Sequence, residues 1–311
     1  MSTRYYGVQN EVKAYCNRLQ NETSIVVTPS VLKTLNDRVE SLKRSGVWSQ
    51  FGLGFNDVDG DAYLSRASVT DVIGRAEVLW FTRGIKSLGL WNNMVSWPLR
   101  SYQNTGTGST VRSLGGLGTF DGAMVNSPTW GSNGINTSPI GSVVNFGAVL
   151  NSLVLNDFQT YMNIFQKGAA VATGNIWDSY GTPVIGLATR RQQLQIISTT
   201  QLRQTHNGYG GITLQTINSN FNSTLGYFRT TQAGPTNYGF DSGLALNGGN
   251  YVTDSVINQV LAIGDYNSIQ TSTGIDITHS FMAIFPKTNI ANFSPLNTLY
   301  RSTLGNGLGL P

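Results

Sequence analysis

The chain of 311 residues contains little of several features that proteins usually have, and each shortage excludes a class of protein. Cys16 is the one cysteine, so no disulfide can form within the chain. Residues 1–20 contain no long apolar run of the kind found in a secretion signal. No other apolar run reaches the roughly 18 residues that a membrane span needs. The sequence therefore predicts a protein that folds in a reducing cytoplasm and does not span a membrane.

Charge is also scarce. Charged residues make up 12% of the chain, about half the usual share, and the formal net charge is +4. The basic residues are scattered and form no run, which argues against a nucleic-acid-binding surface. The chain is rich instead in Asn, Ser, Thr and glycine, of which there are 36. This polar, uncharged, turn-rich composition is typical of extracellular or virion all-β proteins.

The side chains that carry most enzyme chemistry are few. All glutamates precede residue 78: Glu11, Glu22, Glu40 and Glu77. The β region therefore lacks the paired glutamates that many glycosidases use. The histidines His206 and His279 have no neighbouring cysteine or acid at ligand spacing, so we interpret them as surface or hydrogen-bonded residues. The glycine-rich segments S-L-G-G-L-G and G-Y-G-G-I do not lead into a predicted helix, which argues against phosphate binding. The sequence predicts no enzyme activity, no cofactor and no metal.

The first part of the chain predicts two related helical hairpins over residues 4–50 and 61–94. Ala14–Arg18 has the same pattern as Ala62–Arg66, and Thr28-Pro29 and Thr70-Asp71 are candidate helix starts. Each hairpin ends in glycine, an apolar residue and tryptophan, at Trp48 and at Trp91. A short repeat cannot bury its apolar face alone, so the two hairpins are expected to pack together. We assign residues 1–94 to a helical module.

Asp57, Asp59 and Asp61 mimic the start of a calcium-binding loop between the hairpins. An EF-hand loop beginning at Asp57 needs glycine at position 62 and glutamate at position 68, where the chain has Ala62 and Ser68. We therefore interpret the cluster as a polar turn in which Asp59 or Asp61 caps the next helix. A loose calcium site is the lesser alternative.

From Val95 onward the helical period disappears and short β-like runs alternate with turn residues. The predicted strands are 143–146, 151–155, 159–165, 184–189, 193–199, 212–217, 225–230, 259–264 and 279–285. Many short strands at this spacing are typical of an antiparallel sandwich or jelly roll. We assign residues 95–292 to this β domain. Residues 293–311 are expected to form a C-terminal helix and tail that pack on it. In that helix Ser294 would be the N-cap and Pro295 the first helical residue. The fold class predicted is α+β.

One stretch carries a family resemblance. Residues 95–147 contain W-P-L, then V-R-S-L-G-G-L-G-T-F-D-G, then V-N-S-P-T-W and an apolar strand. This stretch resembles the start of a laminin-G-like domain, the concanavalin-A-like jelly roll. The helical segment with S-L-K and Gly-x-Trp before it, and the tail N-G-L-G-L-P, resemble structural proteins of tailed bacteriophages. The resemblance implies a non-enzymatic virion protein, such as a capsid decoration or a tail or head fibre appendage.

The remaining candidate residues are aromatic. Aromatic faces beside amide and hydroxyl side chains suit sugars, and four loop aromatics are the candidates for glycan contact: Trp177, Tyr180, Tyr209 and Tyr238. Trp48 and Trp91 are the candidates for docking to other virion proteins of the capsid or tail, in many copies per particle or as a homo-oligomer. Host-surface glycans are the expected outward ligand. The alternatives are a polysaccharide-degrading enzyme of the virion and a bacterial surface adhesin.

Overall fold

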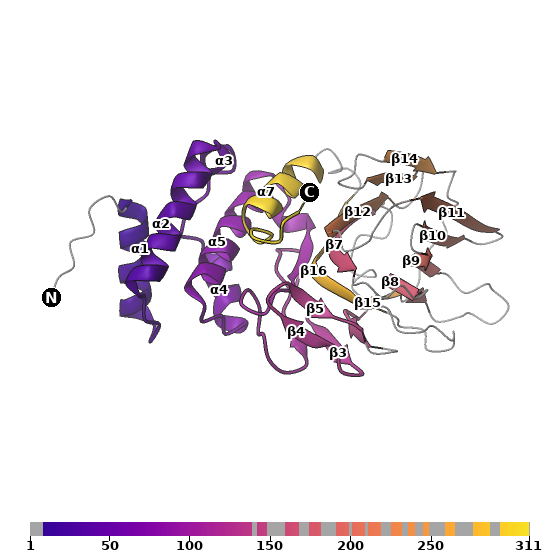
Figure 1. Cartoon of the computed structure of the whole chain (residues 1–311), viewed down its shortest axis with the longest axis horizontal. Coiled ribbons are helices and arrows are strands. Elements are labelled where there is room, and N and C mark those ends of the chain that lie inside the picture. The colour runs from indigo at the N-terminus through magenta and orange to yellow at the C-terminus, as the bar shows by residue number, and fades with distance from the viewer. Residues whose placement is uncertain are drawn as a thin grey trace. The chain divides into compact units, whose positions relative to one another are not determined.

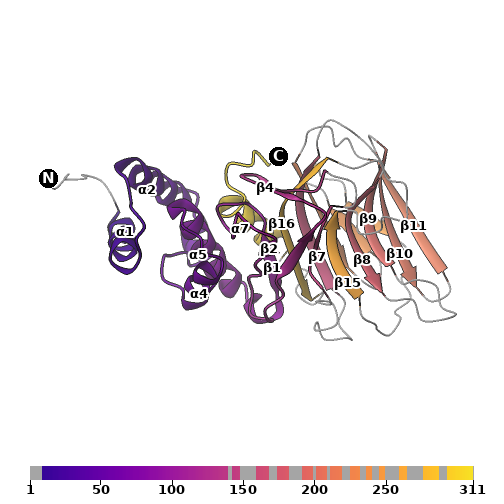
Figure 2. The same cartoon turned by 90° about the horizontal axis from the view of Figure 1, so that it is seen from below.

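The computed structural model divides the chain into a helical unit, residues 1–91 and 292–306, and a β unit, residues 92–291 and 307–311. Figures 1 and 2 show helices in the first unit and antiparallel strands in the second. The residues that the structure describes are 9–138, 142–147, 159–167, 174–181, 191–198, 201–208, 211–218, 225–231, 236–239, 245–248, 259–264, 276–286 and 293–310. The predicted fold class, α+β with antiparallel sheets and a short C-terminal helix, is confirmed.

The helical unit contains the predicted hairpins. Its helices are α1 (Asn10–Glu22), α2 (Pro29–Arg44), α3 (Val47–Gln50), α4 (Val58–Arg66), α5 (Val72–Ser87) and α7 (Phe293–Ser302). The side chains of Thr28 and Asp71 cap α2 and α5, as the sequence predicts. Helix α4 is capped by Asp57 rather than by Asp59 or Asp61, because it begins at Val58 and holds both aspartates in its first turns. Within the described residues, none of the helices is long and apolar enough to cross a bilayer.

The C-terminal helix α7 belongs to the helical unit, which differs from the expected packing on the β domain. Figure 1 shows α7 beside α5. The approach is close, since a methyl group built on Gly84 of α5 would lie 2.4 Å from Leu299. Leu296, Leu299 and Tyr300 of α7 are fully buried. The helix starts at Phe293, one residue before the expected cap Ser294, and residues 307–311 belong to the β unit.

The described strands of the β unit form two large sheets and one small one. The first sheet holds β1 (Val95–Pro98), β4 (Thr129–Gly131), β5 (Gly134–Asn136), β7 (Gln159–Lys167), β12 (Leu225–Thr231) and β16 (Ile277–Pro286). The second holds β2 (Thr110–Val111), β3 (Gly122–Val125), β6 (Val143–Asn145), β8 (Gly174–Gly181), β9 (Arg191–Ser198), β10 (Gln201–Gly208), β11 (Gly211–Asn218) and β15 (Gln259–Gly264). Strands β13 (Thr236–Gly239) and β14 (Ala245–Gly248) form a hairpin. The described strand pairs are antiparallel.

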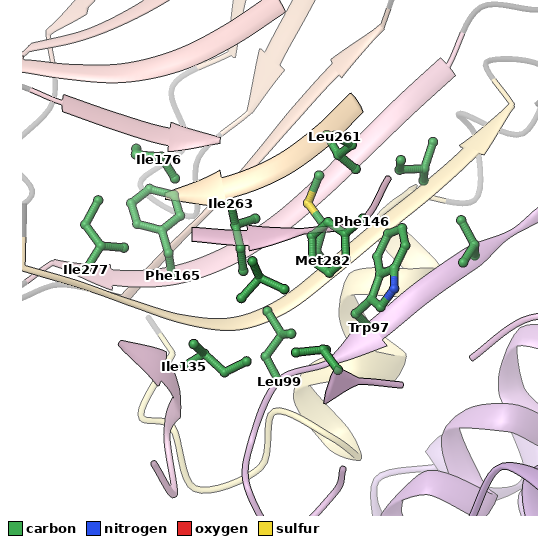
Figure 3. Packing of buried hydrophobic residues seen from close by; sticks show 14 residues of the cluster. Trp97, Leu99, Ile135, Phe146, Phe165, Ile176, Leu261, Ile263, Ile277 and Met282 are labelled. Carbon is green, nitrogen blue, oxygen red and sulfur yellow. The ribbon is translucent and has the colours of Figure 1, made fainter. Parts of the chain in front are cut away.

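The core of the β unit gathers apolar residues from both large sheets. Trp97 of β1 stacks on Phe146 with ring centroids 4.1 Å apart, and the Trp97 indole donates a hydrogen bond to the Phe120 carbonyl oxygen. Figure 3 shows Leu261 and Ile263 of β15 in the same cluster. The W-P-L strand therefore supplies a core tryptophan whose one polar atom is satisfied, as a buried indole requires.

The sequence predicted most of the strands that contain runs of apolar residues, and it missed strands that contain several turn-forming residues. The predicted strands at 159–165, 193–199, 212–217, 225–230, 259–264 and 279–285 correspond to β7, β9, β11, β12, β15 and β16. The sequence did not predict β8 or β10, which contain Gly, Asn, Asp and His. Pairing with neighbouring strands overrides their low intrinsic preference for extended structure. The predictions for 151–155 and 184–189 lie outside the described residues.

Candidate functional site

The two docking candidates occupy equivalent corners of the helical unit. The turn after α2 carries Gly46 at φ +77° before Trp48, and the turn after α5 carries Gly89 at φ +69° before Trp91. The ammonium group of Lys43 lies 5.5 Å from the centre of the Trp48 ring, and that of Lys86 lies 4.9 Å from Trp91. Both indoles are half-buried. The two corners therefore share a backbone conformation and a cation–π contact.

The first helices of the hairpins repeat a second contact. The Arg18 guanidinium lies 5.7 Å from the Tyr15 ring in α1, and the Arg66 guanidinium lies 5.9 Å from the Tyr63 ring in α4. Each pair is separated by three residues, the spacing that brings side chains together on one helix face. The internal repeat of the sequence is thus also a repeat of contacts.

A pocket of about 540 Å³ opens beside Trp48, within the helical unit. Its lining residues are Glu11, Ala14, Tyr15, Arg18, Trp48, Leu53, Gly54, Phe55, Asn56 and Arg83. Phe55 stacks on Tyr15 with centroids 4.3 Å apart and contacts Trp48 at 6.0 Å. Burial raises the pKa of the Tyr15 hydroxyl, so this wall is neutral. Of these lining residues, the sequence predicted only Trp48 as a candidate. Phe55 lies in the following loop and Arg83 in α5, so only tertiary packing brings them to the same pocket.

The Trp91 corner has ionic surroundings instead. Lys86 Nζ bonds both carboxylate oxygens of Asp57 at 2.8 Å and one oxygen of Asp59 at 2.5 Å. Partial burial works against the charged lysine, but the bonds to these two aspartates outweigh it and raise the Lys86 pKa. Arg18 pairs with Asp61 at 2.8 Å. The three aspartates that mimic a calcium loop are therefore each bound to a basic side chain.

Three of the four glycan candidates lie on strands rather than in loops. Trp177 and Tyr180 belong to β8 and Tyr238 to β13, while Tyr209 lies outside the described residues. Trp177 is opposite Ile263, a core residue, in the pairing of β8 with β15. Because opposite residues share a face and faces alternate along a strand, Tyr180 lies on the other face. The register therefore places Trp177 and Tyr180 on opposite faces of β8.

The face that holds Tyr180 is rich in polar residues. We call it the β8–β10 polar face, and register places on it Asp178, Tyr180, Arg191, Gln193, Gln195, Arg203 and Thr205. Figure 2 shows the three strands side by side. Tyr180 is opposite Arg191, and Arg203 is opposite Gln195. Amide, hydroxyl and guanidinium groups can together donate and accept several hydrogen bonds.

Two polar residues lie on the core face of the first sheet. His279 is opposite Phe165 and Asn163 is opposite Met282, and both partners belong to the core. Both polar residues are fully buried, and within the described chain neither ring nitrogen of His279 and neither amide atom of Asn163 has a hydrogen-bond partner. Burial lowers the His279 pKa to about 3, so the ring is neutral. The expectation of a surface or hydrogen-bonded His279 is wrong, and His206 lies in β10, not in a loop.

Two carboxylates of the β unit have described side chains, and both are held by neighbours. Asp121 accepts hydrogen bonds from Arg112 at 2.7 Å and from the Ser113 backbone at 2.9 Å. Asp276 accepts one from Asn136 at 2.8 Å. These two aspartates therefore stabilise turns and strand ends.

The fold resembles known structures although the sequence does not. No protein-family description matches the sequence, and no curated protein matches it. A structure of Trypanosoma rangeli sialidase matches with a TM-score of 0.51 at 14% identity, covering 89% of this chain and 40% of that chain. The same sialidase in complex with sialic acid matches with a TM-score of 0.51 at 14% identity, covering 68% of this chain and 33% of that chain. The chain thus spans between a third and two fifths of those sialidases, and the likeness shows a shared fold.

This comparison corrects one expectation. The sequence predicted that the protein is not an enzyme, and the fold contradicts that prediction because it is shared with a sialidase. The lack of glutamate after Glu77 was one basis of the prediction. It was too narrow, since some glycosidases, sialidases among them, use a tyrosine nucleophile in place of one carboxylate.

Proposed function

We propose that the β unit binds oligosaccharides through the β8–β10 polar face. The observation that carries the proposal is the strand register, which gathers Tyr180, Arg191 and Arg203 with several amides on the face opposite the core. An aromatic ring can pack on the apolar face of a sugar, while amides and guanidinium groups bind its hydroxyls. The fold, which also occurs in a sialidase crystallised with sialic acid, supports the same ligand class.

A matched pair of variants tests the proposed face. Arg203 and Gln204 are neighbours on β10 and occupy opposite faces of the sheet. The full chain is first screened against immobilised oligosaccharides, and the best ligand is then titrated by calorimetry. Arg203→Ala should weaken binding about tenfold, the loss of one charged hydrogen bond, whereas Gln204→Ala should bind as the parent does. Equal effects of the two substitutions, or no saturable binding to any oligosaccharide, would contradict the proposal.

Hydrolysis of glycans is the second candidate function. The likeness to sialidases favours it, and so does the placement of Asp178 and Tyr180 two residues apart on one face of β8. Acids and tyrosine are side chains that glycosidases use as proton donors and nucleophiles. The test is release of free sugar from sialylated and bacterial polysaccharides. Asp178→Asn and Tyr180→Phe should abolish release, and release that survives both substitutions would exclude this face as the catalytic site.

A place on a bacteriophage particle is a separate proposal that rests on the sequence resemblance. In it, the helical unit attaches to capsid or tail proteins through the Trp48 and Trp91 corners, and the β unit meets the host. The half-buried indoles at both corners support it, because partly exposed tryptophan is a frequent anchor at interfaces. Mass spectrometry of purified particles should find the chain in many copies, and a Trp48→Ala, Trp91→Ala double variant should be depleted. Particles without the chain would reject the assignment.

A further inference from the structure

The pocket beside Trp48 has the size of a ligand site. Its volume of about 540 Å³ falls within the range of typical small-molecule pockets. It is lined by residues of α1, the α3 corner, the following loop and α5, so that the two hairpins contribute jointly. The loop segment Leu53–Asn56 forms one wall of the pocket.

One wall of the pocket is aromatic. Phe55 lies between Tyr15, on which it stacks at an interplanar angle of 18°, and Trp80, which it meets edge-on at 5.5 Å. Trp48 meets Trp80 at 6.0 Å and keeps part of its ring exposed. Tyr15, Phe55 and Trp80 bury most of one another. Trp48 therefore offers the most accessible ring to a further aromatic group, and Phe55 reaches the pocket with a small exposed part. The wall therefore favours a ligand with a flat apolar part.

The charges around the pocket do not cancel. Arg18 is paired with Asp61, and Lys43 is paired with Glu11, whose pKa is lowered chiefly by its hydrogen bond to this lysine. Arg83 donates from Nε to the Gly52 carbonyl at 2.7 Å and from Nη1 to the Asn56 carbonyl at 2.9 Å. Among the described residues, Arg83 has no acidic partner and its Nη2 atom has no hydrogen-bond acceptor. One positive charge at the pocket is left unbalanced.

Comparison of the two hairpins shows which residues near the pocket follow from the internal repeat and which do not. The tyrosine–arginine and lysine–tryptophan contacts occur in both hairpins, so the repeat alone accounts for them. Helices α2 and α5 have 16 residues each and end in matching corners, which makes Glu40 the counterpart of Arg83. The repeat therefore does not require a cation at residue 83. The loop between the hairpins supplies Phe55 to this pocket, and the repeat does not account for it either.

We propose that this pocket binds an aromatic carboxylate, with the ring against Phe55 and Trp48 and the carboxylate at Arg83. A single unbalanced guanidinium matches a monoanion better than a phosphate, which carries more charge. The aromatic wall matches a ring better than a neutral, hydroxyl-rich sugar. The same chemistry is offered by a free aromatic acid and by a protein chain that ends in phenylalanine, and the experiment separates these two sources.

The test is titration of the full chain with 3-phenylpropionate, followed by nuclear magnetic resonance and calorimetry. The neutral analogue 3-phenylpropionamide should bind at least about tenfold more weakly, since it lacks the charged hydrogen bond. Arg83→Gln should cause a similar loss, while Arg83→Lys, which keeps the charge, should retain most of the affinity. Arg44→Gln is the matched control, because Arg44 is an exposed cation on α2 that does not line the pocket.

A short peptide ending in phenylalanine, with a free or an amidated terminus, forms the second arm. Tighter binding of the free-terminus peptide than of 3-phenylpropionate would identify the end of a partner chain as the occupant, and the reverse order would identify a small acid. Thermal unfolding of each variant shows whether the loop remains folded. Equal binding of acid and amide, equal binding by parent and Arg83→Gln, or no saturable binding in either arm would overturn the proposal.

Discussion

Leu299 of α7 packs directly on Gly84 of α5, and a methyl group built on Gly84 would lie 2.4 Å from both terminal carbons of the Leu299 side chain. The two residues are far apart in sequence but belong to one unit. Helix α7 thus packs on α5 at a position where any residue larger than glycine would clash with Leu299.

Gly84→Ala should therefore destabilise the helical unit, although alanine favours helix formation. The added methyl group must displace Leu299, which should cost about 1–3 kcal/mol of unfolding free energy. Leu299→Ala alone should cost about 2–5 kcal/mol because it leaves a cavity. In the double variant the new methyl group occupies part of that cavity, so the cost measured by chemical denaturation should be less than the sum. Strict additivity would show that the two residues do not meet.

The two corner glycines should respond alike to substitution. Gly46 and Gly89 both have positive φ, and a methyl group on either would meet no atom within 4 Å. The cost of Gly46→Ala and of Gly89→Ala is therefore backbone strain alone, about 1–2 kcal/mol each. Denaturation of the single variants measures it. A large cost at one corner and none at the other would contradict the equivalence of the hairpins.

Asp57 has two roles that substitution can separate. Its Oδ1 atom accepts hydrogen bonds from the backbone of Asp59 and Gly60, and the carboxylate pairs with Lys86. Asp57→Asn keeps the helix cap and loses the ion pair, which should cost less than about 1 kcal/mol because Lys86 is partly exposed and still bonds Asp59. Asp57→Ala also loses the cap, worth about 1 kcal/mol more. Equal unfolding free energies for the two variants would show that the cap contributes nothing.

His279 should make the β unit sensitive to acid. The folded ring has a pKa of about 3 against an ordinary 6.5, so between these values the unfolded chain binds a proton that the folded chain does not. Stability from this group is therefore complete above pH 6.5 and falls by about 1.4 kcal/mol for each pH unit between 6.5 and about 3. Urea denaturation of the parent and of His279→Phe at several pH values measures the slope. The substitution should remove it.

The matched control for that measurement is His206→Gln, which removes the other histidine of the chain. His206 lies in β10, on a different strand from His279, so this variant should retain the parental pH dependence. If the acid-induced loss disappears in His206→Gln and persists in His279→Phe, the assignment to His279 is wrong.

Local signals in the sequence were enough to predict the starts of α2 and α5 and the turns that follow them. Thr28-Pro29 and Asp71 mark helix starts because a side-chain oxygen there satisfies a free backbone amide, a contact confined to a few residues. The glycines before Trp48 and Trp91 mark turns for the same local reason. Runs of apolar residues marked most of the long strands.

The sequence by itself thus determined which segments are helical, where α2 and α5 begin, that the rest is antiparallel β structure, and that the hairpins repeat. Tertiary structure alone decided which residues meet. Register with β15 put Trp177 and Tyr180 on opposite faces of a strand that local preference assigns to a loop. Packing brought Arg83 to Phe55 and Trp48, and α7 to α5. These outcomes depend on contacts between distant segments, and neither periodicity nor spacing along the chain encodes which distant surfaces fit together.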